Sequence, residues 1–253
     1  MAVFPRACGV RGTVQVRDEP MTIVTLEDLQ TRSQFVRELA SHGCAYVVEG
    51  AAGYARVPSP RRQGHEVELM WTSREEAVRW ADALVEQPKI TAMPLEVLLS
   101  RHLPKLAEEG RLLGVNWSDA PSEPEIAAND LDAQVRRQLV TQFVDAATRT
   151  RQVWVLKIGD QPVTIVTRHP AGGEALPVFT DRASADRAIA GDWNQAAAAR
   201  IPISDFLQKA VIWCVETRRR IAPAYIRGPG LVELHAWEMK AMLSGHMPTR
   251  RVA

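Results

Sequence analysis

The chain has 253 residues, of which 46% are hydrophobic and 24% are charged, and its formal net charge is +1. This composition is typical of a globular protein with a sizeable core, and the near-zero net charge argues against a basic nucleic-acid-binding protein. The three cysteines are too far apart for a CxxC metal motif, and their odd number argues against a disulfide framework, so we expect a cytoplasmic protein. No apolar run approaches the roughly 20 residues that span a bilayer.

The N-terminal stretch 1–20 does not resemble part of a folded domain. Pro5, Arg6 and Arg11 interrupt its apolar segments, so it forms neither a signal peptide nor an amphipathic helix. Met21 opens a segment with apolar residues at helical spacing. We therefore expect a flexible N-terminal extension over residues 1–20 and a first domain that begins at residue 21.

The rest of the chain contains an internal repeat. The numbers of Phe35 and Phe143 differ by 108, and the same offset relates Thr72 to Thr180 without any gap from residue 33 to residue 117. A chance similarity would not keep one register over such a span. The sequence therefore predicts two tandem copies of a unit of about 100 residues, which is a common size for a compact domain.

Each copy is predicted to fold in the order α-β-β-β-α-α-β. In the first copy these segments are a helix over 33–43, strands over 44–50, 54–59 and 66–71, helices over 73–84 and 93–110, and a strand over 112–117. Short β-branched strands joined by turns favour a mainly antiparallel sheet with the helices packed on one face, so the expected fold class is α+β.

The stretch between the copies is predicted to be a linker. It reads SDAPSEPEIAAND, which is rich in proline, serine and acidic residues, and it runs into a helix that enters the second copy. The expected boundaries are 21–120 for the first unit, 121–140 for the linker and connecting helix, 141–246 for the second unit, and 247–253 for a frayed tail.

The stretch WTSREEAVRWA predicts a capped helix. Ser73 and Glu76 fit the S-x-x-E capping box, in which the serine caps a free backbone N–H and the glutamate reaches back. In the second copy Asp181 can cap the equivalent helix, but Ser184 stands where the glutamate would be. Pro104 is expected to end or kink the following helix, because proline lacks the N–H of the helical ladder.

No residue pattern predicts catalysis, a cofactor or a metal. The sequence has no phosphate-binding loop and no nucleophile elbow, and none of its six histidines is repeated at the offset of 108. His65, His102 and His169 are the candidates if an active site lies between the units. The arginine run 218–220 would indicate nucleic-acid binding only if it joined other cations in one stripe, and a helix end explains it more simply.

Features shared by both copies define a candidate interaction surface. Six aromatic or arginine residues lie just before or within the two capped helices, namely Trp71, Arg74, Arg79, Phe179, Arg182 and Arg187. Aromatic and arginine side chains are enriched in the hot spots of protein interfaces. The alternatives are that the two aromatic residues fill equivalent positions in two cores, and that the arginines form ion pairs.

These landmarks resemble a known family. The strands YVV and VWVL, the aromatic followed by TSREEA or TDRASA, and the helices PLEVLL and PISDFL are similar to the bacterial domain of unknown function 2750. The resemblance covers both copies, residues 33–117 and 141–225, and implies a bacterial cytosolic α+β protein without an inherited catalytic residue. In its small α+β units the chain is similar to accessory and immunity-type proteins that bind another protein.

The duplication favours a non-enzymatic protein-binding module, such as an immunity or adaptor protein. Two linked and similar surfaces gain avidity or clasp one partner between them. The alternative is an enzyme of unknown reaction with its site in the cleft between the units and with one degenerate copy. The expected partner is therefore another protein, without a cofactor or a membrane, and nucleic acid is the weaker hypothesis.

Overall fold

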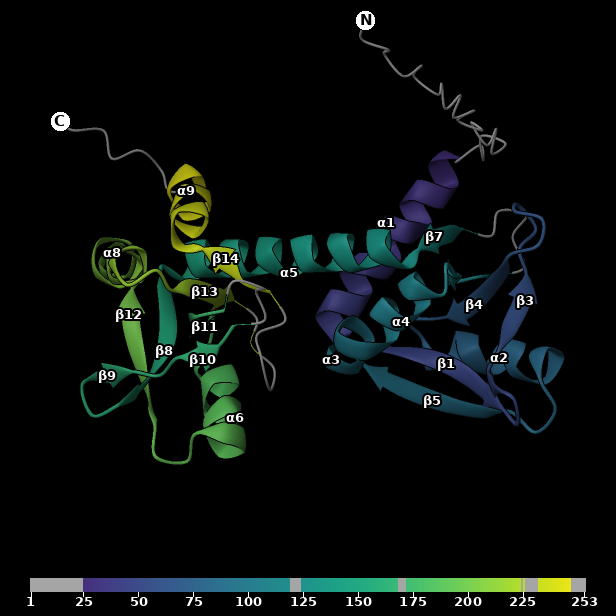
Figure 1. Ribbon diagram of the computed structural model, residues 1–253, viewed down its shortest axis with the longest axis horizontal. Coiled ribbons are helices and arrows are strands. Elements are labelled where there is room, and N and C mark those ends of the chain that lie inside the picture. Colours follow the sequence, from purple (N-terminus) through teal and green to yellow (C-terminus); the bar gives the residue numbers. More distant parts are fainter. Residues whose placement is uncertain (1–24, 119–123, 168–171, 224, 226–231, 247–253) are drawn as a thin grey trace, which may run out of the picture.

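The computed structural model describes residues 25–118, 124–167, 172–223, 225 and 232–246 (Figure 1). The N-terminal extension expected over residues 1–20 and the tail expected over 247–253 lie outside this range. Among the described residues, none of the helices is long and apolar enough to cross a membrane.

The chain forms two units of the same architecture, called unit 1 and unit 2 below. Unit 1 comprises α1 (Leu26–His42), β1 (Cys44–Gly50), β2 (Gly53–Tyr54), β3 (Arg56–Pro58), β4 (Glu66–Met70), α2 (Arg74–Leu84), β5 (Lys89–Pro94), α3 (Leu95–Val97), the π-helical turn η1 (Leu98–His102), α4 (Leu103–Glu108), β6 (Leu112–Val115) and β7 (Glu125–Ala127). Unit 2 comprises α5 (Ala128–Thr150), β8 (Gln152–Ile158), β9 (Gln161–Pro162), β10 (Ile165–Val166), β11 (Glu174–Phe179), α6 (Arg182–Asp192), β12 (Ala197–Pro202), α7 (Ile203–Asp205), the π-helical turn η2 (Phe206–Ala210), α8 (Val211–Glu216), β13 (Arg220–Pro223), β14 (Leu234–His235) and α9 (Ala236–His246).

The offset of 108 between the copies also relates the elements of the two units, and it shows that they share helix α5. Helix α1 ends at His42, and the equivalent position in the second copy, Thr150, is the end of α5. Helix α5 begins at Ala128, and the position equivalent to it at the same offset, Ala236, is the start of α9. The first turns of α5 therefore close unit 1 as α9 closes unit 2, and its later turns open unit 2 as α1 opens unit 1.

Each unit contains a mainly antiparallel sheet. In unit 2 the strand order is β12-β8-β11-β13-β14, with β9 beside β8 and β10 beside β11, and β11 and β13 run parallel. Unit 1 has the same arrangement in two parts, β2-β1-β5 and β3-β4-β6-β7, with β4 and β6 parallel. A single bridge between Tyr46 of β1 and Trp71, directly after β4, connects the two parts. The predicted α+β class and the tandem arrangement are therefore confirmed.

Helices cover both faces of each sheet. Helices α1, α4 and α5 pack on one face of unit 1, in a cluster that includes Val47 of β1. Helix α2 packs on the opposite face, where Ala77 and Ala81 meet Val48 of the same strand. Helix α6 takes the equivalent place in unit 2. The sequence predicted helices on one face of the sheet. The structure has a second helical layer on the other face, so strand β1 is buried on both sides.

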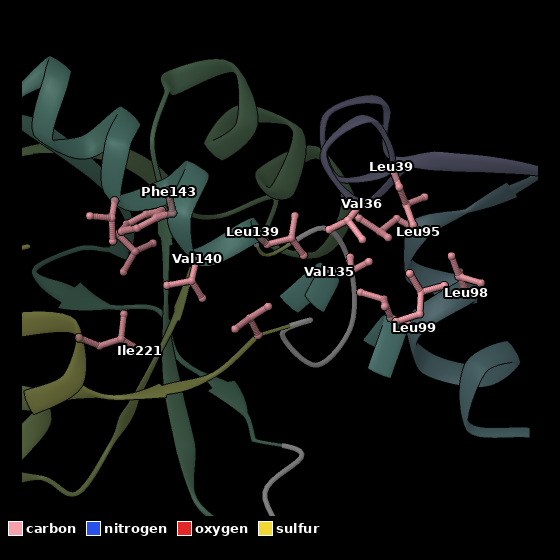
Figure 2. Close-up of a cluster of buried hydrophobic side chains, with 14 of the residues drawn as sticks. Val36, Leu39, Leu95, Leu98, Leu99, Val135, Leu139, Val140, Phe143 and Ile221 are labelled. Carbon is pink, nitrogen blue, oxygen red and sulfur yellow. The ribbon is translucent and has the colours of Figure 1, made fainter. Parts of the chain in front are cut away.

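One hydrophobic core runs through both units along α5 (Figure 2). Val135 lies on the side of α5 near Val36 and Leu99 of unit 1, whereas Phe143 lies toward unit 2, whose Ile221 belongs to the same cluster. Since one helix contributes buried side chains to both units, their packing is continuous rather than that of two separate domains.

Four strands lie where none was predicted, namely β5, β7, β12 and the two-residue β14. Strands β5 and β12 pair with β1 and β8 at the sheet edges, and most of their residues are exposed or half-buried, so they lack the apolar alternation that identifies a strand in a sequence. Strand β7 lies in the predicted linker over 121–140 and pairs with β6. The linker prediction therefore differs from the structure at Glu125–Ala127, which extend the sheet of unit 1, whereas the connecting helix expected after them is observed as α5.

The predicted capping box of α2 forms only in part. The hydroxyl of Ser73 accepts a hydrogen bond from the N–H of Glu76 at 3.4 Å, but the Glu76 carboxylate forms an ion pair with Arg79 at 2.9 Å. A complete capping box occurs instead at the start of α1, between Thr25 and Asp28.

Pro104 does not end its helix. Helical structure continues from α3 through η1 and α4, and Pro104 occupies one of the first positions of α4, after the π-helical turn. Unit 2 has the same π-helical turn but carries Ile212 at the equivalent position. Proline is therefore accommodated by this turn and does not cause it.

Candidate functional site

The two aromatic residues of the predicted interaction surface belong to the cores. Trp71 is 0% exposed, and its indole N–H donates to the carbonyl oxygen of Trp117 at 2.9 Å. Phe179 is 3% exposed and packs edge-on against Tyr225, with 6.3 Å between the ring centroids. The structure therefore corrects the surface assignment of Trp71 and Phe179 in favour of packing, although one edge of Phe179 reaches the groove described below.

The four arginines of that surface are exposed on α2 and α6, as Arg74, Arg79, Arg182 and Arg187. Arg79 and Arg182 form ion pairs within their own helices, at 2.9 and 3.3 Å, and their side chains are 73% and 72% exposed. Such exposed pairs contribute little to stability. Of the four, Arg187 lines the groove between the units.

A groove lies where unit 1 meets unit 2, and it is called the inter-unit groove below. Its volume is about 840 Å³, within the range of ligand-binding cavities. One wall is the C-terminal end of α1 with the start of α3, and the other is α5, the end of β11 and α6. The groove is lined by Ala40, Ser41, His42, Gly43, Leu95, Leu139, Gln142, Phe143, Asp145, Ala146, Arg149, Val178, Phe179, Thr180, Asp181, Ser184, Arg187, Ala188 and Tyr225.

The inter-unit groove has an apolar floor and a charged rim. Its buried lining residues are Leu95, Leu139, Phe143, Val178, Phe179, Ala188 and Tyr225. The charged or titratable residues along its rim are His42, Asp145, Arg149, Asp181 and Arg187. This arrangement can hold an apolar group and contact charges of both signs around it.

Asp181 connects the rim to the start of α6. Its carboxylate accepts hydrogen bonds from the N–H and the hydroxyl of Ser184, both at 2.8 Å, and from the hydroxyl of Thr180 at 3.3 Å. Burial disfavours the charged carboxylate, but these hydrogen bonds outweigh that effect and lower the pKa of Asp181 below its usual value. Asp181 is therefore an ionised N-cap, as the sequence predicts, and its charge is engaged in fixing α6.

Two large side chains of unit 1 are replaced by alanine in the inter-unit groove. Glu38 and Trp80 correspond, at the offset of 108, to Ala146 and Ala188. In unit 1 Glu38 accepts a hydrogen bond from Thr72, and Trp80 packs against the cluster beneath α2. Unit 2 thus leaves open a space that side chains occupy in unit 1.

The histidines considered for catalysis do not meet in this groove. His102 contacts the buried carboxylate of Glu68 inside unit 1, His65 lies on an exposed loop, and His169 lies outside the described residues. His42, which was not a candidate, is the described histidine that lines the groove. A search of the described residues for three or more metal-binding side chains in one group found none.

Other residues with chemical potential have structural roles. Cys214 is buried, and this burial raises the pKa of its thiol to about 12, which does not suit a nucleophile. Arg219, from the run 218–220, forms an ion pair with Glu174 at 2.7 Å and lies over the ring of Trp213 at 4.6 Å. Arg220 donates to the carbonyl oxygen of Glu233 at 3.3 Å, so two of the three arginines of the run are held by their own unit, which does not favour a nucleic-acid interface.

One polar contact recurs in both units and was not predicted. The hydroxyl of Ser59 donates to the carboxylate of Glu125 at 2.7 Å, and at the equivalent positions of unit 2 Thr167 donates to Glu233. Each pair ties the loop that follows β3 or β10 to the segment at β7 or β14. The acidic partners lie beyond the ungapped span 33–117, so extending the offset past residue 117 would have found them.

Comparisons with known proteins agree with the duplication. The family described as "Protein of unknown function (DUF2750)" matches the chain twice, over residues 32–135 and 140–243. No curated protein matches the chain. Among solved structures, the chain is similar to Anabaena Tic22 (protein transport), with 15% identity over 76% of this chain and 92% of that one. The TM-score of 0.25 for this pair is too low to carry an argument.

Proposed function

The chain belongs to the DUF2750 family through two tandem domains, and we propose that it is a non-enzymatic protein-binding module whose partner docks in the inter-unit groove. An immunity protein or a regulatory adaptor of the bacterial cytosol is a concrete form of this function. The observation that carries the proposal is the groove itself, because residues of both copies build it and a single copy would not contain it.

The composition of the groove suits a protein partner. Phe143 and Tyr225 on the floor offer aromatic surface, and Arg149 and Arg187 on the rim offer charged hydrogen-bond donors. Protein interfaces combine an apolar centre with a polar rim, and aromatic and arginine side chains dominate their binding energy. The shared helix α5 holds the two walls in one packed core, so we expect little rearrangement on binding.

The enzyme alternative places its site in the same groove and has less support. General acid–base or nucleophilic catalysis needs groups within hydrogen-bond reach of each other. In the part of the chain that the structure describes, no hydrogen bond joins His42 to Asp145 or Asp181 on the rim. We therefore favour binding over catalysis for this groove.

A photocrosslinking experiment in the native host tests this proposal. Benzoylphenylalanine is placed at Asp145 on the groove rim or, as a matched control, at Arg37, the exposed residue 108 positions earlier in unit 1. We expect a discrete covalent adduct with one protein from position 145 and no such adduct from position 37. Equal adducts from both positions, or no adduct from position 145, would contradict docking in the groove.

A further inference from the structure

We propose that the inter-unit groove recognises a carboxylate beside an aromatic ring on a segment of the partner protein, in the positions that Glu38 and Trp80 occupy in unit 1. The inference rests on the proposed function, because it names the chemistry of the docking segment. It comes from comparing the two copies, since unit 1 shows which side chains fill this space when the chain supplies them itself.

Unit 1 holds an ionised carboxylate at this position. The carboxylate of Glu38 accepts hydrogen bonds from the hydroxyl of Thr72 and from the side-chain amide of Gln34, the latter at 2.8 Å. Burial disfavours its charge, but these hydrogen bonds, with smaller effects of Asn116 and His42, lower the pKa of Glu38 below its usual value. The site is therefore built for the charged form of a carboxyl group.

Unit 2 keeps both donors and has alanine at the position of the acceptor that they share in unit 1. Gln142 and Thr180 correspond to Gln34 and Thr72 and line the groove, whereas Ala146 replaces the glutamate. The amide of Gln142 donates instead to a serine hydroxyl of unit 1 at 3.1 Å, and the hydroxyl of Thr180 donates to the neighbouring Asp181 at 3.3 Å. The Gln142 contact lies at the long end of the usual N–H···O range, and the Thr180 contact is longer than usual for O–H···O, so a carboxylate that enters the groove can form a charge-assisted bond with the amide and a shorter bond with the hydroxyl.

The rim carries two arginines, one of which has no counterpart in unit 1. Arg149 stands where unit 1 has Ser41, and it has no ion-pair partner among the described residues. Arg187 lies across the groove on α6. The negative charges of the ionised Asp181 and of Asp145, which stands where unit 1 has Arg37, oppose a bound anion, so the hydrogen-bond donors and the arginines together must outweigh them. Charge-assisted hydrogen bonds of this kind are stronger than neutral ones.

The aromatic part of the proposal rests on Ala188. Its counterpart Trp80 projects a large ring from the same helical position in unit 1. In unit 2 the alanine leaves this space to the groove, beside the aromatic floor of Phe143 and Tyr225. Aromatic rings prefer edge-to-face or offset contacts with other rings, so a flat side chain fits this floor better than a branched aliphatic one.

Two matched peptides test the carboxylate on the full chain. Acetyl-Glu-Trp-amide and acetyl-Gln-Trp-amide differ only in the charged group, and amide chemical shifts of the groove residues report their binding by NMR. We expect the glutamine peptide to bind at least about tenfold more weakly, which corresponds to about 1.4 kcal/mol. Acetyl-Glu-Ala-amide, which lacks the ring, is expected to bind more weakly than acetyl-Glu-Trp-amide by a similar factor.

Two variants separate specific recognition from weak adhesion. Thr180→Val removes one donor and is expected to bring the glutamate and glutamine peptides to similar affinities, while Thr180→Ser is expected to restore the difference. Ala146→Glu places the carboxylate of unit 1 in the groove and is expected to abolish the binding of both peptides.

Equal binding of the two peptides to the unmodified chain would overturn the carboxylate assignment. Absence of peptide binding with a persistent photoadduct at position 145 would overturn this inference alone, whereas loss of that adduct as well would overturn the proposed function.

Discussion

Replacing Val135 with aspartate is expected to destabilise both units at once. Val135 is fully buried on α5 within the cluster that joins the units. A carboxylate there has no partner, and we expect a cost of about 4 kcal/mol or more in the free energy of unfolding. Because α5 is both the last helix of unit 1 and the first helix of unit 2, the loss is expected to reach unit 2 although Val135 lies on the side of unit 1.

Fluorine NMR of chain labelled with 5-fluorotryptophan measures this effect in each unit separately. Trp71 and Trp117 report on unit 1, and Trp154 and Trp213 report on unit 2, during unfolding by urea. The control Ala133→Asp adds the same charge at an exposed position of the same helix. If the signals of unit 2 kept their original midpoint in Val135→Asp, the shared core would not be a cooperative one.

Replacing Arg61 with alanine is expected to cost about 3 kcal/mol in the free energy of unfolding. The guanidinium of Arg61 donates two hydrogen bonds of 2.8 Å to the carboxylate of Asp28, which is 0% exposed. Removing the arginine leaves a buried carboxylate without the cation that binds it directly. Arg62→Ala is the matched control, because the neighbouring arginine is exposed and its side chain makes no such pair in the described structure.

The same pair predicts a dependence of stability on pH. The hydrogen bonds and charge of Arg61 lower the pKa of Asp28 to about 2, from an ordinary value of 3.8. Because the pKa of Asp28 is lower in the folded state than in the unfolded state, its ionised carboxylate stabilises the fold at pH values above the unfolded-state pKa. This contribution to the free energy of unfolding is about 2 kcal/mol, and it disappears as the pH falls from about 4 to about 2. Urea unfolding at pH 7 and pH 3 is expected to show about half of this loss, about 1 kcal/mol, in the unmodified chain and in Arg62→Ala, and a smaller loss in Arg61→Ala. An equal loss in all three proteins would contradict the assignment to Asp28.

The sequence predicts those parts of the fold that depend on identities between the copies. Phe35 and Phe143 fill equivalent places in one core, and a single offset therefore located both units and the capped starts of α2 and α6. The double role of α5 could not be predicted in this way. Its first turns correspond to α9 and its later turns to α1, and the sequence alone does not show that one helix serves both alignments.

The candidate site was only partly predictable, because repeated residues can serve packing or binding. Trp71 and Phe179 are large in both copies since both cores need the same volume, and this similarity led to their assignment to a surface. The groove arises where the copies differ. Alanines at 146 and 188 carry no chemical signal of their own, and their meaning appears only when the structure places them beside the donors retained from unit 1.

Filling the inter-unit groove tests the account most directly. The double variant Ala146→Glu, Ala188→Trp gives unit 2 the side chains that unit 1 carries at the same positions, so we expect the fold to accommodate them. A control variant carries the same additions at Ala133 and Ala183, which are exposed on α5 and α6. The measurement is the yield of the photoadduct from position 145 at matched expression and matched unfolding midpoints. We expect a photoadduct yield at least about tenfold lower in the filled-groove variant and an unchanged yield in the control. An undiminished adduct in the filled-groove variant would contradict docking of the partner in the inter-unit groove.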